Sequence, residues 1–236
     1  ESFVRVPVAG LLDAGYLAAR SQLIRTDASM GKVGPGLPRG AEVAYADSQQ
    51  DYGGGTSHIS VVDADGNAVA ITSSIESTFG SQVMVRGTLL NNQLTDFDFS
   101  PAEGDRPVAN RVQPGKRPRR SMVPTLVFDA DGKLFMVVGS SGGSRLINYV
   151  LKALIATIDW NLDIQAAISL PNVGNRNGPT EIEDVPGWQE LAVALRSIGH
   201  TVRVSDMTSG TQGIMRTRDG WTGGADPRRE GIAKGE

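Results

Sequence analysis

Residues 53–74 read GGGTSHISVVDADGNAVAITSS, a run of three glycines followed by the pattern of a β-hairpin. Residues 57–63 and 67–74 are rich in alternating or consecutive apolar side chains, and Ala64-Asp65-Gly66 between them is typical of a turn. This stretch therefore predicts two antiparallel strands that begin directly after a flexible glycine segment.

The rest of the chain predicts a mixture of strands and helices. Residues 125–128 and 134–138 repeat the hairpin pattern around a turn. Apolar periodicity predicts the remaining helices and strands, which are helices over 10–25, 145–159, 163–169 and 187–198, and strands near 201–206, 212–217 and Trp221. Strand and helix do not alternate strictly, so we expect an α+β fold in which helices are layered on antiparallel sheet.

Composition narrows the possible classes of protein. The chain has 236 residues, 29 of them glycine, which fits one large domain or two small ones. The absence of cysteine excludes a disulfide scaffold and a thiolate metal site, and two histidines are too few for a histidine metal centre without help from carboxylates; we predict no metal. A net charge of −3 argues against nucleic-acid binding, and no apolar stretch approaches the roughly 20 residues of a membrane span.

The pair Gly55-Thr56 is the first candidate for chemistry. Residues 26–55 are expected to be irregular or mobile, and they end in Gly53–Gly55. If the chain were cut before Thr56, the new α-amino group could act as the base for the weakly nucleophilic Thr hydroxyl. The alternative is an ordinary glycine-rich loop that leads into a hairpin.

Three more polar clusters stand between predicted elements. Residues 139–144, GSSGGS, join a strand to a helix, where free backbone N–H groups could bind an oxyanion, or they form a common glycine-rich turn. Residues 91–97, NNQLTDF, form either a polar pocket wall or an Asx-rich turn. Residues 116–122, KRPRRSM, are basic without interleaved aromatics, which is typical of a solvated face.

In this order, the four clusters resemble the γ-glutamyltranspeptidase family of N-terminal-nucleophile hydrolases. The resemblance covers nearly the whole chain through LLDAGYLAAR, TSHISVVDADGNAVAITSSIESTFG, LLNNQLTDFDF, PGKRPRRSMVPT, GSSGGSR, LPNVGNRNGPTEIE and GGADPRREG. It implies a four-layer αββα sandwich and a precursor that cuts itself between Gly55 and Thr56. Residues 1–55 would then be the C-terminal tail of a large subunit, and residues 56–236 the small catalytic subunit. The large subunit from the same precursor would be the partner that completes the fold.

The resemblance also implies roles for the catalytic residues. Thr56 corresponds to the nucleophile, and its α-amino group to the base. Ser74 stands where the family usually has a second Thr, whose hydroxyl hydrogen-bonds the nucleophile. Gly142 and Gly143 correspond to the backbone oxyanion hole.

The substrate-binding residues follow by the same correspondence. Gln93 and Asp96 match residues that hold the α-carboxylate and α-amino ends of a glutamyl group, and Glu76 would contact the α-amino group. Ser121 matches the second Ser of a Ser-Ser pair that binds the α-carboxylate. Arg120 replaces the first Ser, and this large cation could fill the pocket or pair with a substrate carboxylate.

A second departure concerns the lid over the site. Residues 101–115, PAEGDRPVANRVQPG, are shorter than the usual lid and contain no aromatic gate. An open cleft that admits bulkier substrates is expected. Both departures resemble the branch of cephalosporin acylases and small-amide amidohydrolases.

Three functions remain open from the sequence. The first is a γ-glutamyl hydrolase or transferase that acts on glutathione-like amides through a Thr acyl-enzyme, without a metal or organic cofactor. The second is an acylase for other carboxylate-bearing amides, of glutaryl, cephalosporin-like or oxamate-like type. The third is a non-enzymatic relic subunit. The family resemblance favours a periplasmic or secreted protein but also allows a cytoplasmic one.

Overall fold

The predicted hairpin forms the outermost layer of the molecule. In the computed structural model, which describes residues 3–41, 45–46 and 55–235, β1 (Thr56–Val62) pairs antiparallel with β2 (Ala68–Ser74). The register sets Thr56 opposite Ser74. At the other end, the Asp63 carboxylate accepts hydrogen bonds from two backbone N–H groups of the turn and closes it.

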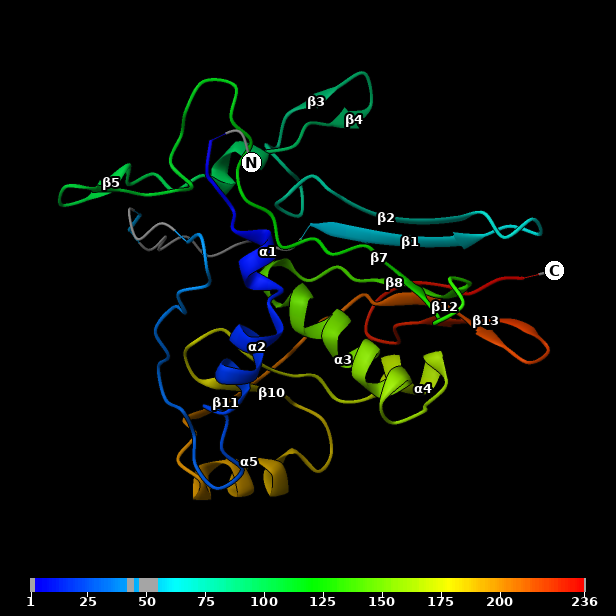
Figure 1. The fold of residues 1–236 in the computed structure, drawn as a ribbon. Helices are drawn as coiled ribbons and strands as arrows, with labels where there is room; N and C mark the ends of the chain where they lie inside the picture. Colours follow the sequence, from blue (N-terminus) through cyan, green and yellow to red (C-terminus); the bar gives the residue numbers. More distant parts are fainter. Residues whose placement is uncertain (1–2, 42–44, 47–54, 236) are drawn as a thin grey trace.

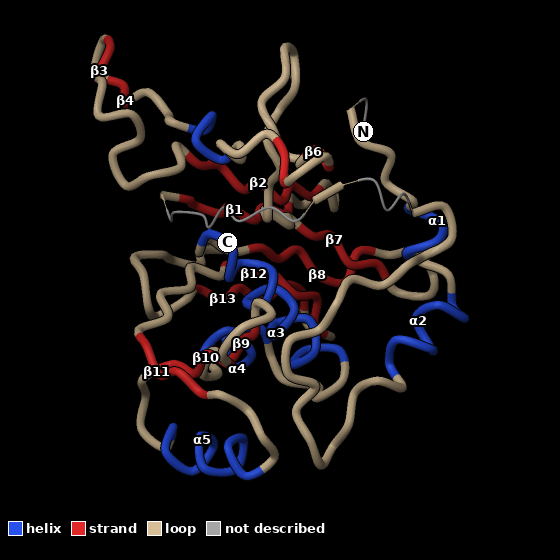
Figure 2. Tube along the Cα trace, turned by 90° about the vertical axis from the view of Figure 1, so that its left-hand side faces the viewer, coloured by secondary structure: helices blue, strands red, loops and turns tan. Residues whose placement is uncertain are grey.

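A four-stranded antiparallel sheet forms the second layer. Its order is β13-β12-β8-β7, with bounds Gly220–Ala225, Gln212–Thr217, Leu134–Gly139 and Thr125–Phe128. The β1–β2 hairpin packs on one face of this sheet, against β8 and β12. Helices α3 (Leu146–Ile158) and α4 (Ile164–Ser169) cover the other face, and Figures 1 and 2 show the three layers stacked in this order.

The core lies between the sheet and these two helices. β8 contributes Met136 and Val138, both 0% exposed, and α3 packs Leu146, Val150 and Ala153 against them. α4 adds Ile164 and Ile168 to the same cluster. The sheet is thus held by apolar contacts on its helical face.

The hairpin is covered on one face only. Its inner face carries the buried Thr56 and His58, whereas Ile59, Val61 and Ile71 on the outer face are 57%, 48% and 51% exposed. The described chain therefore supplies three layers of an α+β sandwich.

A second sheet of three strands was predicted only in part, because its strand near 201–206 was expected and its other two strands were not. It comprises β9 (Val173–Asn175), β10 (Thr180–Glu183) and β11 (Val202–Ser205), in the order β11-β10-β9. β10 and β11 are parallel and are joined through α5 (Trp188–Ser197), so the expectation of purely antiparallel sheet was wrong here. The sequence TEIE of β10 gave no strand signal because two of its buried side chains are carboxylates.

The N-terminal helix is broken in two. Residues 10–25 were predicted as one helix, but α1 (Val8–Leu11) and α2 (Ala14–Ser21) are separate. The Asp13 carboxylate accepts a hydrogen bond from the backbone N–H of Tyr16 at 2.8 Å and caps the start of α2. A new helix therefore begins after Asp13, and α1 does not continue through it. The other predicted helices and strands are confirmed to within about two residues at each end.

Irregular segments precede and follow the β1–β2 hairpin in the chain. Residues 26–41 contain no helix or strand, as expected, whereas Gly53 and Gly54 lie outside the described residues. The short elements of this region are β3 (Met84–Val85), β4 (Thr88–Leu89), the 3-10 turn η1 (Gln93–Asp96), β5 (Ala102–Glu103) and β6 (Arg106–Pro107). None of the helices in the described part of the chain is long and apolar enough to cross a membrane.

Candidate active site

Thr56 and Ser74 meet at the open end of the hairpin. The Thr56 hydroxyl donates to Ser74 Oγ at 3.0 Å, and the Ser74 hydroxyl donates to the carbonyl oxygen of Gly55 at 3.2 Å. Ser74 Oγ also accepts from the backbone N–H of Glu76 at 2.9 Å. One hydroxyl group therefore joins the predicted nucleophile to the carbonyl of the predicted scissile bond.

Gly55 is required by close backbone packing. A Cβ atom at this position would lie 2.5 Å from the carbonyl oxygen of Ser77 and 2.6 Å from that of Glu76. Glu76 itself has a φ of 74°, a left-handed conformation that is costly for a residue other than glycine. The backbone is thus tightly specified directly before Thr56 and just after the partner strand β2.

The predicted oxyanion loop follows β8. Gly142 and Gly143 have φ values of 131° and 60°, and a Cβ at Gly142 would lie 2.4 Å from the ring of Tyr149. Glycine is therefore needed at Gly142 for conformation and for space. The carbonyl of Gly143 accepts a hydrogen bond from the Ser121 hydroxyl at 3.0 Å, which joins this loop to the basic segment 116–122.

The predicted substrate residues converge from separate segments. Gln93 and Asp96 lie on η1, where the Gln93 side-chain amide donates to the carbonyl of Ser74 at 3.1 Å. Asp96 is only 3% exposed, and its carboxylate forms an ion pair with the Arg120 guanidinium. Because a buried carboxylate needs a compensating cation, this pair is the main electrostatic contact of the site.

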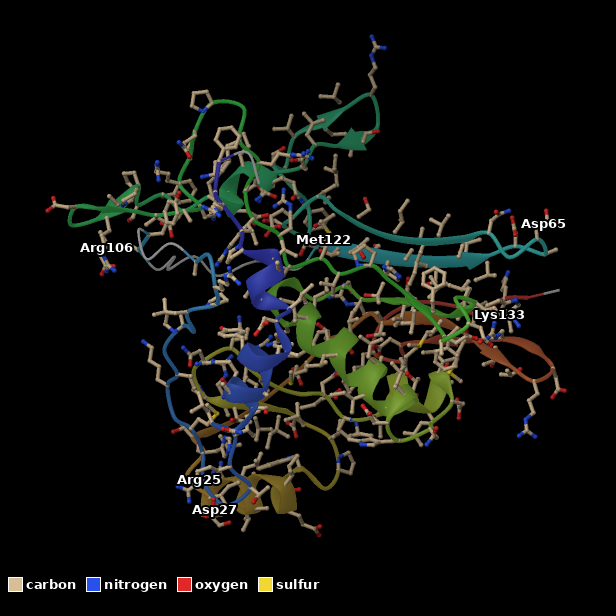
Figure 3. The ribbon with its side chains drawn as sticks, in the orientation of Figure 1. Arg25, Asp27, Asp65, Arg106, Met122 and Lys133 are labelled. Carbon is tan, nitrogen blue, oxygen red and sulfur yellow. The ribbon has the colours of Figure 1, made fainter. Side chains whose placement is uncertain are left out.

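These groups enclose a cavity of about 320 Å³, including its open mouth. Its lining consists of Thr56, Ser74, Glu76, Gln93, Asp96, Arg119, Arg120, Ser121, Met122, Gly143 and Leu146. All the residues predicted to bind substrate are present, and Gly142 adjoins the lining through Gly143. In Figure 3, Met122 lies near the start of β1, at the opposite end of the hairpin from Asp65 in its turn.

The whole chain also matches one known family. A profile described as gamma-glutamyltranspeptidase matches residues 1–236. The chain belongs to the gamma-glutamyltranspeptidase family. It is 37% identical to the "Glutathione hydrolase proenzyme" of Bacillus subtilis (strain 168) over 99% of its own length and 40% of that protein, so it spans well under half of this relative.

Solved structures agree with the family and the fold. A crystal structure of the Helicobacter pylori gamma-glutamyltranspeptidase T380A mutant matches 73% of this chain and 100% of its own, with a TM-score of 0.65 and 33% identity. The cephalosporin acylase from Bacillus halodurans matches 100% of this chain and 41% of its own, with a TM-score of 0.79 and 27% identity. The N-terminal-nucleophile sandwich expected from the sequence is thus confirmed.

Three lining residues and one supporting residue of the site were not predicted. The lining residues are Arg119, Met122 and Leu146. Asn110 donates its side-chain amide to the carbonyl of Asp96 at 2.7 Å and accepts from the backbone N–H of Arg119 at 2.9 Å. A lone Asn within residues 101–115 carried no sequence signal for this bridge.

A second, wider cavity of about 900 Å³ adjoins Thr56 from another side. Its lining consists of Thr56, Ser57, His58, Ser141, Thr208, Gly210, Gln212, Arg228, Arg229 and Glu230. Burial lowers the pKa of His58 to about 4. The ring nitrogens of this histidine contact the hydroxyls of Thr72 and Ser60 at 2.8 and 3.1 Å, so it is a neutral packing residue at physiological pH.

A buried polar network holds the chain that leads into the predicted oxyanion loop. The Asp226 carboxylate, 1% exposed, accepts from the Ser209 hydroxyl at 2.6 Å and from the backbone N–H of Thr211 at 3.1 Å. The Thr211 hydroxyl then donates to Ser140 Oγ at 3.1 Å. Because these groups are buried and mutually satisfied, they fix the chain where it enters the loop.

Proposed function

We propose that this chain is the catalytic portion of a self-cleaving amide hydrolase or acyltransferase, with Thr56 as nucleophile, that acts on γ-glutamyl amides such as glutathione. The observation that carries the proposal is the Ser74 hydroxyl, which contacts both Thr56 Oγ1 and the Gly55 carbonyl at the edge of the cavity. A hydroxyl that donates to the scissile carbonyl can stabilise the negative charge that develops on its oxygen when a nucleophile attacks.

Self-cleavage follows from this geometry. Thr56 Oγ1 adds to the carbonyl carbon of Gly55, the C–N bond breaks, and the hydroxyl proton passes to the nitrogen of Thr56. The resulting ester is hydrolysed by water, which leaves a carboxylate on Gly55 and an α-amino group on Thr56. The solved Helicobacter pylori chain supports this division, because it matches a length of this chain close to that of residues 56–236.

Turnover would reuse the same groups. The Thr56 hydroxyl attacks the amide carbonyl of the donor, and its α-amino group takes the proton and passes it to the leaving amine. The N–H groups of Gly142 and Gly143 stabilise the oxyanion, a contribution of about 2.7–4 kcal/mol per donor. Water or an amine acceptor then releases the acyl group from the Thr56 ester.

The γ-glutamyl donor is the first candidate substrate. Gln93, Asp96, Glu76 and Ser121 line the cavity beside Thr56, where they could hold the two charged ends of a glutamyl group. The name of the Bacillus subtilis relative, a glutathione hydrolase, supports this assignment.

An acylase for other carboxylate-bearing amides is the second candidate. The ion pair between Arg120 and Asp96 favours it, because it occupies the carboxylate assigned to the donor's α-amino group. The likeness to the Bacillus halodurans cephalosporin acylase supports it too. Glutaryl, cephalosporin-like and oxamate-like amides belong to this class.

A large subunit from the same precursor is the proposed partner. The exposed apolar side chains on the outer face of the hairpin, among them Ile59 and Ile71, are suited to a covering layer. The proenzyme relative, of which this chain covers 40%, has ample further length to supply that layer.

The test is the Thr56→Ala variant of the whole precursor. We expect it to remain uncut and to show no turnover, whereas Thr56→Ser retains slow cleavage because it keeps a hydroxyl. Ser57→Ala, which removes the neighbouring hydroxyl, is the matched control and should cut normally. Mass spectrometry reads the cut, and cleavage before residue 56 in Thr56→Ala would overturn the proposal. An uncut and inactive wild-type protein would favour a relic subunit.

A further inference from the structure

The turn between β9 and β10 holds a segment that precedes the proposed cut. The side-chain carbonyl of Asn177 accepts from the backbone N–H of Val33 at 2.7 Å, and the Asn177 amide donates to the carbonyl of Val33 at 2.8 Å. One side chain thus pairs with both polar groups of a backbone residue, as a neighbouring strand does in an antiparallel sheet. The two residues are 144 positions apart in the sequence, so the contact joins distant parts of the chain.

Asn177 is held in place for this contact by its own turn. Its φ of 65° is left-handed, a conformation that asparagine tolerates better than most residues do. Its backbone N–H donates to the side-chain carbonyl of Asn175 at 2.7 Å, and the Asn175 amide donates to the carbonyl of Gly178 at 3.0 Å. Because the turn has hydrogen bonds of its own, the docking of Val33 requires little further ordering on this side.

A second contact lies four residues earlier in the same segment, which follows α2 and is blue in Figure 1. The backbone N–H of Ser29 donates to the carbonyl of Ile198 at 2.6 Å, at the C-terminal end of α5. Carbonyl groups at the end of a helix lack partners within the helix, so this one is open to a donor from another segment. These contacts of residues 29–33 use main-chain groups of the segment and therefore depend little on its side chains.

The turn that holds Val33 also contacts the predicted oxyanion loop. Arg176, which precedes Asn177, donates from its guanidinium to Ser144 Oγ at 2.6 Å. Ser144 directly follows Gly143, one of the two glycines predicted to form the oxyanion hole. The docked segment and the loop beside Thr56 are therefore attached to the same turn.

We propose that the turn of residues 175–178 is a docking site for the tail of the large subunit, and that it keeps residues 29–33 bound after the chain is cut before Thr56. This inference rests on the proposed function, because the cut is what makes residues 1–55 part of a separate subunit. The contact then passes from within one chain to between two subunits, with its hydrogen bonds unchanged. The site fits a main-chain segment that presents the N–H and the carbonyl of one residue on the same side.

The deciding experiment measures hydrogen exchange at the Val33 amide in the whole processed protein, with mass spectrometry as the readout. Asn177→Gly removes the side chain but keeps a residue suited to the left-handed turn. We expect the Val33 amide to exchange at least tenfold faster in this variant, and trypsin to cut after Lys32 faster by a similar factor. Asn161→Gly is the matched control, because Asn161 is also exposed and left-handed, with a φ of 56°, and it should leave both rates within about threefold.

Two further variants separate main-chain docking from a general loss of structure. Asn177→Asp keeps an acceptor for the Val33 N–H but loses the donor to the Val33 carbonyl, so it should give an intermediate rate of exchange. Val33→Ala keeps both main-chain groups and should stay within about threefold of the wild-type protein. A loss in Val33→Ala as large as that in Asn177→Gly would show that the side chain, and not the main chain, is recognised.

Three other results would overturn the inference. They are an unchanged Val33 amide in Asn177→Gly, an equal rise in Asn161→Gly, and a Val33 amide that loses its protection once the wild-type protein is cut, compared with uncut Thr56→Ala. If the wild-type protein is never cut, the proposed function fails. The Asn177→Gly comparison is then made on the uncut chain, where tenfold faster exchange still supports the docking site and an unchanged rate refutes it.

Discussion

The two sheets that meet at the active site differ in how completely this chain covers them. The four-stranded sheet is enclosed on both faces along its central strand β8, where Met136, Val137 and Val138 are each 0% exposed. The β1–β2 hairpin is enclosed on one face, and Val69 on its outer side is 48% exposed. The predicted oxyanion loop follows β8, and Thr56 begins the hairpin, so the candidate active site depends on how the hairpin is held against β8.

The largest expected effect comes from disturbing the contact between the two sheets. A Cβ at Gly139 would lie 2.2 Å from the His58 ring, so Gly139→Ala should push the hairpin away from β8. We expect a loss of about 3 kcal/mol of stability and no self-cleavage. Thermal unfolding and mass spectrometry of the whole precursor measure both.

Two variants control this prediction. Gly178→Ala adds a methyl group in open space and should change little. Adding His58→Ala to Gly139→Ala makes room for the new methyl group and should recover part of the stability. Normal cleavage in Gly139→Ala would show that the hairpin does not rely on this contact.

The next effect concerns chemistry at the edge of the hairpin. Ser74→Ala removes the hydroxyl that joins Thr56 to the Gly55 carbonyl, so self-cleavage should slow about 10²-fold, which is equivalent to about 2.7 kcal/mol. Ser74→Thr keeps the hydroxyl and should stay within about tenfold. Ser73→Ala, on the exposed side of the same strand, is the control. A time course of precursor cleavage in which Ser74→Ala matches Ser73→Ala would contradict the role of Ser74.

A smaller effect is a difference in how the stability of the two sheets depends on pH. The pKa of His58 is lowered to about 4 by burial, against an ordinary value near 6.5, so the unfolded chain binds this proton more readily. The stability that the neutral His58 provides is therefore complete above about pH 6.5 and is lost as the pH falls toward 4. None of the four strands β7, β8, β12 and β13 contains a histidine.

Hydrogen exchange measures this difference between the sheets. We expect the amides of β1 to lose protection between pH 6.5 and 4 ahead of those in β8. His58→Asn keeps a polar side chain without the titration and should remove that difference. Equal loss in both sheets of the wild-type protein would count against a histidine-specific weakening.

The smallest effect tests whether the outer face is covered in the whole protein. Val69→Thr and Val137→Thr are the same isosteric change on the exposed and the buried sheet. If a large subunit covers the hairpin, Val69→Thr should cost about 1 kcal/mol in the processed protein, comparable to Val137→Thr. Thermal unfolding is the measurement, and a cost near zero for Val69→Thr would mean that this face stays in water.

Local signals in the sequence were enough to predict much of the fold. The alternation in residues 57–74 predicted the β1–β2 hairpin, and the glycines of 139–144 indicated the tight turn before α3. Both depend on neighbours in the chain, which is why pattern and turn chemistry predicted them. The family resemblance then indicated which distant segments share one cavity.

Contacts that depend on packing between distant segments were not predictable in the same way. Nothing local indicates that Arg120 turns toward Asp96, or that His58 fits against Gly139. The buried strand β10 carries Glu181, whose pKa is lowered to about 2 chiefly by its hydrogen bonds to Arg145. A charged strand of this kind becomes recognisable only when its arginine partners are in place.

The single hydrogen of the Ser74 hydroxyl has a consequence for the order of events. In the uncut chain the Ser74 hydroxyl donates this hydrogen to the Gly55 carbonyl, and Ser74 Oγ accepts a hydrogen bond from the Thr56 hydroxyl. The proposed cut would carry that carbonyl away and release the hydrogen for a new acceptor. Maturation would then change the hydrogen-bond partners of Ser74 once. The hydrogen bonds that make the cut would be lost, and those that serve turnover of substrate would replace them.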